Sequence, residues 1–204
     1  MLLGLASPLV LGSGSPSRAA LLKASGLSFE IDPANIDESA IRKVLTQNNG
    51  GAPADIAEVL ARAKAETVSE RNPGALVIGA DQVLALGDLT FEKPQTMEDA
   101  RQTLLKLQGQ THQLHSAVAL ARGGEVHWTK IDTAHLTMHP LSPEDIGQYL
   151  AAAGEAVLSS VGAYKLESIG VQLFKEIKGD YFTVLGLPLL ALLNQLRGEA
   201  ANAS

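Results

Sequence analysis

Residues 75–81 read Ala-Leu-Val-Ile-Gly-Ala-Asp, a continuous apolar run that ends in an acidic side chain. Such a run is typical of a strand buried on both faces, because a half-exposed strand alternates apolar and polar residues. The run brings Asp81 to the end of this strand, where α/β proteins usually place ligand chemistry. Gln82-Val83-Leu84 continues in a strand-like pattern, which disfavours a turn or capping role for Asp81. We therefore predict that Asp81 is a functional residue.

A second informative stretch lies upstream, where Leu9-Val10-Leu11 runs into Gly12-Ser13-Gly14-Ser15-Pro16-Ser17-Arg18. We expect a short buried strand, a small loop and a helix whose first turn carries Arg18. Backbone N–H groups at the helix start, the hydroxyls of Ser13, Ser15 and Ser17 and the Arg18 guanidinium would form a cradle for an anion. An ordinary strand-to-helix connection, capped by serine and proline, fits the same pattern. The local pattern leaves both interpretations open.

Two familiar phosphate loops do not fit this stretch. The dinucleotide-binding fingerprint needs a glycine at the position of Ser17, and a P-loop needs Gly-Lys-Ser/Thr, whereas no lysine precedes Lys23. The chain also lacks the Gly-x-Ser-x-Gly elbow of serine hydrolases. A Rossmann-type dehydrogenase or methyltransferase is therefore disfavoured.

The rest of the chain predicts strands and helices that do not strictly alternate. We expect helices over residues 19–24, 56–71, 96–109, 142–153 and 189–196, and strands over residues 29–31, 112–121, 126–137, 171–177 and 181–185. Turns are indicated at Gly87-Asp88 and at 178–180, and the residues after Arg197 are expected to form a flexible tail. This order predicts a single α/β domain over residues 1–204, with a long mixed sheet flanked by helices.

Composition narrows the class of protein. Of the 204 residues, 46% are hydrophobic and 19% are charged, which supplies a packed core and excludes intrinsic disorder. The 16 Lys and Arg against 22 Asp and Glu give a net charge of −6, which opposes non-specific binding to nucleic acid or to an anionic membrane. The absence of cysteine excludes disulfides and thiolate chemistry. Since the N-terminus lacks a basic signal-peptide region and no apolar run could span a bilayer, we expect a cytoplasmic protein.

Three further charged residues are candidates only in combination. Glu38 follows the second predicted strand, where an acidic loop residue is usually just solvated. Lys64 lies four residues from both Leu60 and Val68, at the edge of a buried helical stripe, where a lysine can simply extend its ammonium group to solvent. Lys93 lies in an extended segment after the hairpin and indicates nothing by itself.

The five histidines raise the possibility of a metal site. His112 and His115 are three residues apart on one predicted strand, however, so their side chains face opposite sides. We therefore disfavour a metal ion held by histidine.

In order along the chain, these segments resemble the Maf family of nucleoside triphosphate pyrophosphatases from about Leu9 to Arg197. Residues 13–18 are similar to the family's Ser-x-Ser-Pro-Arg-Arg loop. The other matching motifs are Ile36-Asp37-Glu38, Ala63-Lys64-Ala65, residues 78–83, Lys93-Pro94, Gly154-Glu155, Gly162-Ala163-Tyr164 and residues 179–188. Each motif is weak alone, and the ordered set is strong.

The resemblance implies a fold like that of Maf and inosine triphosphatase proteins, with two lobes around a nucleotide cleft. It implies hydrolysis of the α–β phosphoanhydride of ordinary or modified nucleoside triphosphates to the monophosphate and pyrophosphate. Arg18, Lys64 and Lys93 would neutralise the phosphates, and Ser13, Ser15, Ser17 and Gln82 would help to bind the substrate. Asp81 and Glu38 would hold Mg²⁺ or Mn²⁺, with Asp81 also accepting a proton from water. The partner implied is a nucleoside triphosphate, with no nucleic acid or membrane and with a possible homodimer.

The sequence departs from the family pattern at several positions. Ser17 stands where the family usually has the first arginine, and Glu92 replaces the glycine before Lys93. Asp81-Gln82-Val83 and Lys165-Leu166-Glu167-Ser168 are similar to the branch that acts on 7-methyl-GTP rather than on dTTP and UTP. The cation missing at Ser17 keeps a second function open, that of a weakly catalytic nucleotide-binding regulator of cell division and septum formation.

Overall fold

The computed structural model describes residues 4–47 and 51–202, which form a seven-stranded mixed sheet. Its strands are β1 (Leu9–Leu11), β2 (Glu30–Ile31), β3 (Leu76–Leu86), β4 (Leu89–Phe91), β5 (Thr111–Arg122), β6 (Glu125–Met138) and β7 (Phe174–Lys178). They lie in the order β2-β1-β3-β5-β6-β7, and β4 pairs with β3. β1 is parallel to β2 and β3, and the other pairings of these strands are antiparallel. The predicted α/β fold with a mixed sheet is confirmed.

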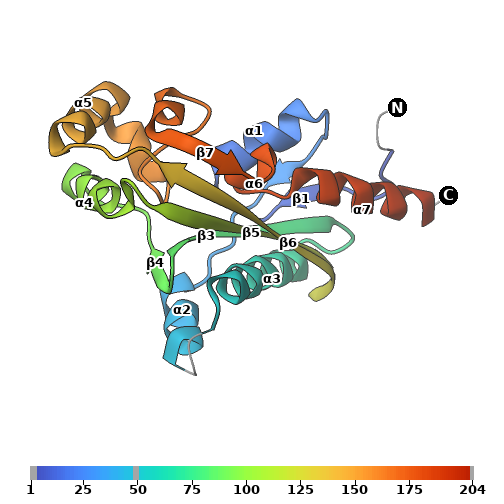
Figure 1. The fold of residues 1–204 in the computed structure, drawn as a ribbon. Coiled ribbons are helices and arrows are strands. Elements are labelled where there is room, and N and C mark those ends of the chain that lie inside the picture. The colour runs from blue at the N-terminus through green and yellow to red at the C-terminus, as the bar shows by residue number, and fades with distance from the viewer. Residues whose placement is uncertain (1–3, 48–50, 203–204) are drawn as a thin grey trace.

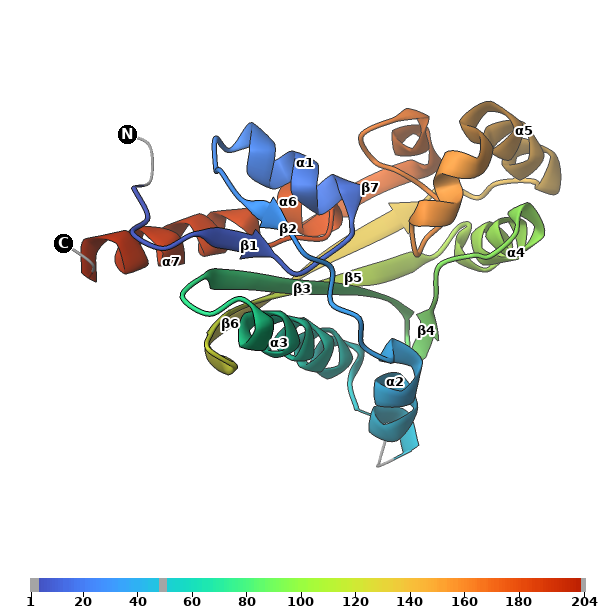
Figure 2. The same ribbon diagram turned by 180° about the vertical axis from the view of Figure 1, so that it is seen from behind.

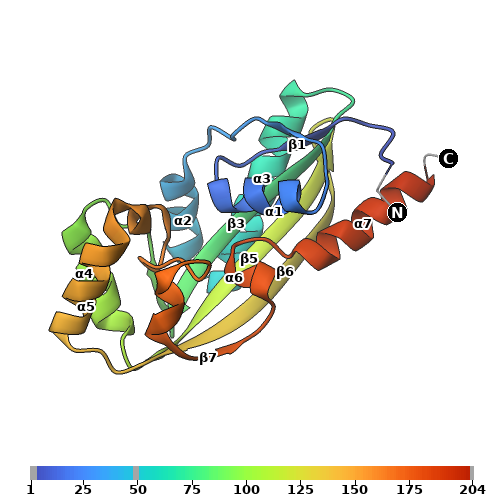
Figure 3. The ribbon, with the colours of Figure 1, turned by 90° about the horizontal axis from the view of Figure 1, so that it is seen from above.

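Helices cover both faces of the sheet (Figure 1). α3 (Pro53–Arg71) lies on one face, and α1 (Pro16–Ala24), α6 (Tyr181–Val184) and α7 (Leu189–Asn202) lie on the other, as seen from above in Figure 3. α4 (Met97–Leu107) and α5 (Pro143–Ala153) pack together at the end of the sheet away from the termini, and two 3₁₀ helices, Gly154–Ser159 and Ile169–Leu173, follow α5. α2 (Glu38–Gln47) lies at the periphery, near β4 and one end of α3 (Figure 2). Among the described residues, no helix combines the length and the hydropathy needed to cross a bilayer.

Small residues bring α3 very close to β3. A Cβ atom at Gly79 would overlap the backbone oxygen of Ala61 and the backbone nitrogen of Ala65. Ala61 and Ala65 are themselves fully buried, and the facing positions of β5 include further buried alanines. This backbone contact fixes the distance between helix and strand, and so places Lys64 against Asp81.

β3 continues well beyond Asp81, so the prediction that Asp81 ends the strand is wrong. The residues that follow it pair with β5 as far as Ala85, and Val83, Leu84 and Ala85 are fully buried. Buried backbone N–H and C=O groups need hydrogen-bond partners, and pairing with β5 supplies them. The strand therefore continues through these residues. Asp81 is therefore held in the middle of β3, a central strand, where it pairs with Ala117 of β5.

Near the C-terminus, the strand predicted over residues 181–185 is instead the short helix α6. Asp180 starts this helix, since its Oδ2 atom accepts a hydrogen bond from the backbone N–H of Thr183 at 3.1 Å. The preceding strand, predicted from Val171, begins only at Phe174, because residues before it form the 3₁₀ helix. The turn residues were identified, but their helix-capping role was missed.

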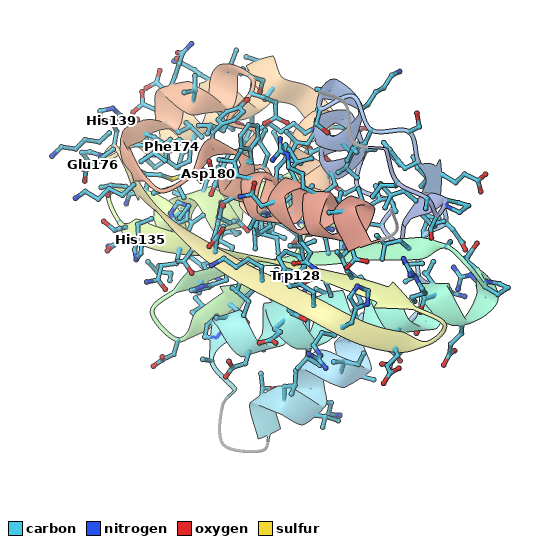
Figure 4. All side chains as sticks on the ribbon, turned by 90° about the vertical axis from the view of Figure 1, so that its right-hand side faces the viewer. Trp128, His135, His139, Phe174, Glu176 and Asp180 are labelled. Carbon is cyan, nitrogen blue, oxygen red and sulfur yellow. The ribbon has the colours of Figure 1, made fainter. Side chains whose placement is uncertain are left out.

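The closing helix α7 is longer than predicted and continues beyond Leu196 to Asn202. Glu199, in the segment expected to be a flexible tail, lies 3.8 Å from the Arg122 guanidinium and 3.2 Å from Nε2 of His127. Figure 4 shows Trp128 on β6 beside α7, and Trp128 packs against the apolar cluster that contains Leu192. These contacts dock the C-terminal helix on the hairpin of β5 and β6.

Two predicted helix starts are confirmed in atomic detail. Thr96 and Asp99 form a capping box at α4, and Ser142 and Asp145 form another at α5. The predicted hairpin turn at Gly87-Asp88 connects β3 to β4. These local signals identify elements well because each cap satisfies backbone groups that the helix itself leaves free.

His112 on β5 is expected to make the fold acid-sensitive. Its ring is fully buried, its Nε2 atom lies 2.7 Å from the Tyr164 hydroxyl, and burial lowers its pKa from 6.5 to about 4. Below pH 6.5 the unfolded chain binds a proton that folded His112 binds only near pH 4, so the free energy of unfolding falls across this window. The loss contributed by His112 is about 3 kcal/mol at most.

Denaturant unfolding of the wild type and His112→Gln at pH 7.5 and pH 4.5 measures this effect. The variant should lose less stability between the two pH values, whereas His139→Gln, at an exposed histidine, should behave like the wild type. An unchanged pH dependence in His112→Gln would contradict the assignment.

Candidate active site

A cavity of about 580 Å³ lies beside the middle of β3. Segments far apart in the sequence line it, namely the loop between β1 and α1, α2, the residues after β4, residues 159–161 and 164–167, and the connection between α6 and α7. The cavity lining includes every site residue predicted from the sequence, Ser13, Ser15, Ser17, Arg18, Glu38, Lys64, Asp81, Gln82 and Lys93. The fold thus brings the predicted set together in one place.

Lys64 and two carboxylates form the charged centre of this cavity. The Nζ atom of Lys64 lies 2.7 Å from Oδ1 of Asp81 and 2.7 Å from Oε1 of Glu38. Lys64 is only 7% exposed and Asp81 only 4%, so this lysine does not extend to solvent as it could at the edge of a helical stripe. A buried lysine needs partners that offset its desolvation, and the two carboxylates supply them.

Glu38 occupies the first turn of α2, a helix that the sequence did not predict. The Asp37 side chain accepts a hydrogen bond from the backbone N–H of Ala40 at 2.9 Å, which starts the helix and turns Glu38 toward Lys64. Burial is the largest influence on Glu38 and would raise its pKa. The hydrogen bond from Lys64 and the charges of Lys64, Arg42 and Arg18 outweigh burial and lower the pKa of Glu38 below its usual value.

Arg42, one turn after Glu38 on α2, is a site residue that the sequence analysis missed. Its Nη2 atom lies 3.3 Å from Oδ2 of Asp81 and 4.0 Å from Oε2 of Glu38. The spacing of Glu38 and Arg42 puts both side chains on one face of α2, while Ile41 and Leu45 pack against the apolar cluster beside α3. This amphipathic spacing was the signal that could have revealed the helix and its second charge.

Two of the three side-chain nitrogens of Arg18 donate hydrogen bonds to other residues of the protein. Its Nη1 atom donates to the Ala80 carbonyl and to Oγ of Ser13, each at 2.9 Å, and its Nε atom donates to the Gly186 carbonyl at 2.8 Å. Burial lowers the pKa of Arg18, although the charges of Asp81 and Glu38 oppose this shift. In the described part of the chain, no hydrogen bond uses Nη2. Arg18 therefore links three segments of the cavity wall and keeps one donor nitrogen for a ligand.

The serines of the first loop divide into two kinds. Ser15 is the N-cap of α1, and Ser13 accepts hydrogen bonds from the Ser15 backbone N–H at 3.3 Å and from Arg18. The capping interpretation of the loop is thus correct for Ser15, and it coexists with a cavity position. Ser17 is half-buried, lines the same cavity and makes no side-chain hydrogen bond to the described residues.

Gln82 follows Asp81 on β3 and lines the cavity. Its Nε2 atom lies 3.0 Å from Oγ of Ser116 and 3.1 Å from each of the Thr183 and Val184 carbonyl oxygens. Ser116, whose Oγ donates to the Thr183 carbonyl at 2.8 Å, belongs to the same network. This network anchors the α6 segment to the central strands, a role that the sequence did not predict.

Lys93 is the cation of the site with the fewest protein partners. It makes no ion pair within the described residues, and its exposed side chain lines the cavity. Burial lowers its pKa, and repulsion from Arg18 and Lys64 lowers the pKa further, while Glu38 and Asp81 partly oppose both effects. An anionic ligand would stabilise the charged form of Lys93, which makes this lysine a candidate phosphate ligand.

The donor set of this centre fits a hard divalent cation. Lys64 bridges Oε1 of Glu38 and Oδ1 of Asp81, and the second oxygens of the two carboxylates, Oε2 and Oδ2, lie near Arg42. Mg²⁺ commonly binds one or two carboxylates together with substrate phosphates and water. No cluster of three or more His, Cys, Asp or Glu suited to a metal occurs within residues 4–47 and 51–202. His135 and His139, which are labelled in Figure 4, are not among the residues that line the cavity.

Comparisons with known proteins agree over nearly the whole chain. A family model described as Maf-like protein matches residues 8–199. The chain is 54% identical over 191 residues to a protein of Brucella abortus named 7-methyl-GTP pyrophosphatase, covering 94% of this chain and 96% of the relative. A protein of Mesorhizobium japonicum with the same name is 54% identical, covering 93% and 94%. A protein of Rhodopseudomonas palustris named nucleoside triphosphate pyrophosphatase is 48% identical, covering 94% of each chain.

Proposed function

This chain belongs to the Maf-like proteins and is a nucleoside triphosphate pyrophosphatase, and we propose that its preferred substrate is 7-methyl-GTP. Hydrolysis would give 7-methyl-GMP and pyrophosphate, which would keep the modified nucleotide out of nucleic acid synthesis. The observation that carries the catalytic proposal is the Lys64, Glu38 and Asp81 centre inside a cavity that also holds Arg18 and Lys93.

The chemistry follows from these charges. A water oxygen forms a bond to phosphorus, the bond to the α–β bridging oxygen breaks, and the electron pair leaves with pyrophosphate. We assign Asp81 as the group that accepts the proton from water, and Lys64, Lys93 and Arg18 as the cations that stabilise the charge on the leaving group. An acidic chain can bind a triphosphate because the field in the cavity is local.

We propose that Asp81 and Glu38 hold a divalent cation, Mg²⁺ or Mn²⁺, together with the substrate. When bound, this ion would supply positive charge next to the phosphates. Lys64 would bridge the two carboxylates and add positive charge beside the phosphates. Chelation of the ion should abolish pyrophosphate release without unfolding the protein.

Glu167 supports the choice of base. It lines the cavity near Leu166 and Tyr164, which form part of its apolar wall. Methylation at N7 gives guanine a positive charge, so an adjacent carboxylate favours the methylated base over guanine itself. Gln82, which belongs to the other motif shared with the 7-methyl-GTP branch, lines the same cavity.

Pyrophosphate release from a panel of canonical and modified triphosphates tests the proposal. We expect 7-methyl-GTP to give the highest kcat/KM. Glu167→Gln should lower the preference for 7-methyl-GTP over GTP by about tenfold, the effect of losing roughly 1.4 kcal/mol of discrimination. Glu176→Gln, at an exposed glutamate of β7, should leave the preference unchanged. An unaltered preference in Glu167→Gln would contradict the role of this carboxylate.

Ser17 gives a second expected result. A serine hydroxyl offers a neutral hydrogen bond, whereas an arginine at this position would add a second cation at the start of α1. We expect Ser17→Arg to raise kcat/KM about tenfold, equivalent to about 1.4 kcal/mol. Steady-state kinetics of pyrophosphate release measure this change in kcat/KM, and Ser17→Ala is the control for losing the hydroxyl. Lower activity in Ser17→Arg together with lower activity in Ser17→Ala would mean that the hydroxyl itself contacts the substrate.

A cytoplasmic location and a homodimeric assembly stay predictions. Gel filtration with light scattering measures the assembly directly.

A further inference from the structure

Arg42 and Lys64 together engage both oxygens of Asp81. Lys64 Nζ lies 2.7 Å from Oδ1, and Arg42 Nη2 lies 3.3 Å from Oδ2. Each oxygen therefore carries one charge-assisted contact, and the two contacts together use about half of the lone pairs that the carboxylate could offer to a water molecule or another ligand. Opening one of these contacts when the substrate binds would free an oxygen for the roles proposed for Asp81.

The contact of Arg42 is the one suited to open. It is the longer of the two, and the Arg42 side chain is 19% exposed, against 9% for that of Lys64. Lys64 is fixed by the close packing of α3 on β3, whereas α2 lies at the periphery of the molecule (Figure 2). Arg42 also borders a second, smaller cavity of about 290 Å³, which gives its side chain room to move.

The partner that would attract Arg42 away from Asp81 is phosphate. A guanidinium group binds phosphate oxygens in a two-point arrangement, and the triphosphate tail as a whole carries more negative charge than a single carboxylate. Arg42 lines the main cavity together with Arg18, Lys64 and Lys93, so a triphosphate tail in this cavity lies within reach of its long side chain.

We propose that Arg42 is a substrate-responsive phosphate ligand. In the free enzyme it is paired with Asp81, and it transfers to the β- and γ-phosphates when the triphosphate binds, which frees Oδ2 of Asp81. This inference rests on the proposed function, since it assumes that the cavity receives a triphosphate. It predicts that Arg42 contributes to binding of the pyrophosphate portion and not to binding of the nucleoside monophosphate portion.

Calorimetric binding of inorganic pyrophosphate and of 7-methyl-GMP tests the proposal in the wild type, Arg42→Met, Arg42→Lys and Lys43→Met. Methionine keeps much of the apolar volume of arginine without its charge. Lys43→Met is the matched control, because Lys43 is the next residue of α2 and the same charge is lost. We expect pyrophosphate to bind about tenfold more weakly to Arg42→Met, with partial recovery in Arg42→Lys and no change in Lys43→Met. Binding of 7-methyl-GMP should be the same in all four proteins.

Kinetics with 7-methyl-GTP separate phosphate binding from a purely structural role. We expect Arg42→Met to raise KM about tenfold while kcat stays within about twofold, the pattern for a contact made equally in the ground state and the transition state. Equal pyrophosphate affinity in the wild type and Arg42→Met would overturn the proposal. A fall in kcat at constant KM would also overturn it, since Arg42 would then be holding Asp81 in place during the reaction. Failure of the proposed function would appear differently, as a wild-type protein that releases no pyrophosphate from 7-methyl-GTP.

Discussion

Asp81→Asn is expected to lower kcat by about 10²-fold or more while the protein stays folded, the scale associated with loss of a positioned proton acceptor. Asp81 accepts from Lys64 at one oxygen and from Arg42 at the other. An asparagine has one acceptor oxygen and one NH₂ donor, so its NH₂ group must face one of these cations. The variant thus loses the base and one charge-assisted contact together, while the surrounding strand pairing stays intact.

Single-turnover kinetics and thermal unfolding of the purified variant measure the two parts of this expectation. Asp88→Asn is the matched control, because Asp88 lies on the same hairpin, in the exposed turn between β3 and β4. The control should keep wild-type turnover. Turnover close to wild type in Asp81→Asn would exclude Asp81 as the proton acceptor.

Arg18→Ala is expected to damage both activity and stability. The side chain donates to the Ala80 and Gly186 carbonyls and to Ser13, and it is 8% exposed. Removing it leaves three buried acceptors without their charged donor, a loss of about 3 kcal/mol or more in the free energy of unfolding. It also removes a cation from the phosphate cavity, for which we expect kcat/KM to fall by about 10²-fold or more.

Arg18→Lys distinguishes these two effects. Lysine restores the charge, but its single ammonium group cannot reproduce the fork of donors that connects the three segments. We expect partial recovery of kcat/KM with little recovery of stability, measured by kinetics and by denaturant unfolding. Arg101→Ala, at a more exposed arginine of α4, should change neither quantity. If Arg18→Ala were as stable as Arg101→Ala, the linking role of Arg18 would be wrong.

Much of the fold was predictable because its signals are local. The buried run before Asp81 and the two capping boxes depend on neighbouring residues, and each identifies the correct element. The failures occurred where tertiary context decides. Tyr181–Val184 has strand-like residues, yet the cap supplied by Asp180 makes it helical. The extension of α7 depends on contacts of Glu199 with the β5–β6 hairpin, which are remote in sequence.

The candidate site shows the same division. The family motifs indicated which side chains form the site, and all of the predicted site residues line the cavity. The sequence could not show that Arg18 is bonded mainly to backbone carbonyls or that Gln82 anchors α6, because these partners lie far along the chain. Arg42 was missed because residues 36–38 were interpreted as a loop, so the helical spacing of Glu38 and Arg42 was not considered.

The backbone contact at Gly79 limits which amino-acid substitutions this protein can accept during evolution. Any side chain at residue 79 would push α3 away from β3 and separate Lys64 from Asp81, although residue 79 itself carries no charge. A substitution of Gly79 should therefore be as harmful as the loss of a charged group of the site. α2 carries Glu38 and Arg42 of the charged centre, but its other residues are under no such packing constraint, since α2 lies at the periphery and packs through Ile41 and Leu45. We expect related proteins to diverge at these other positions of α2 while keeping the packing of α3 on β3 unchanged.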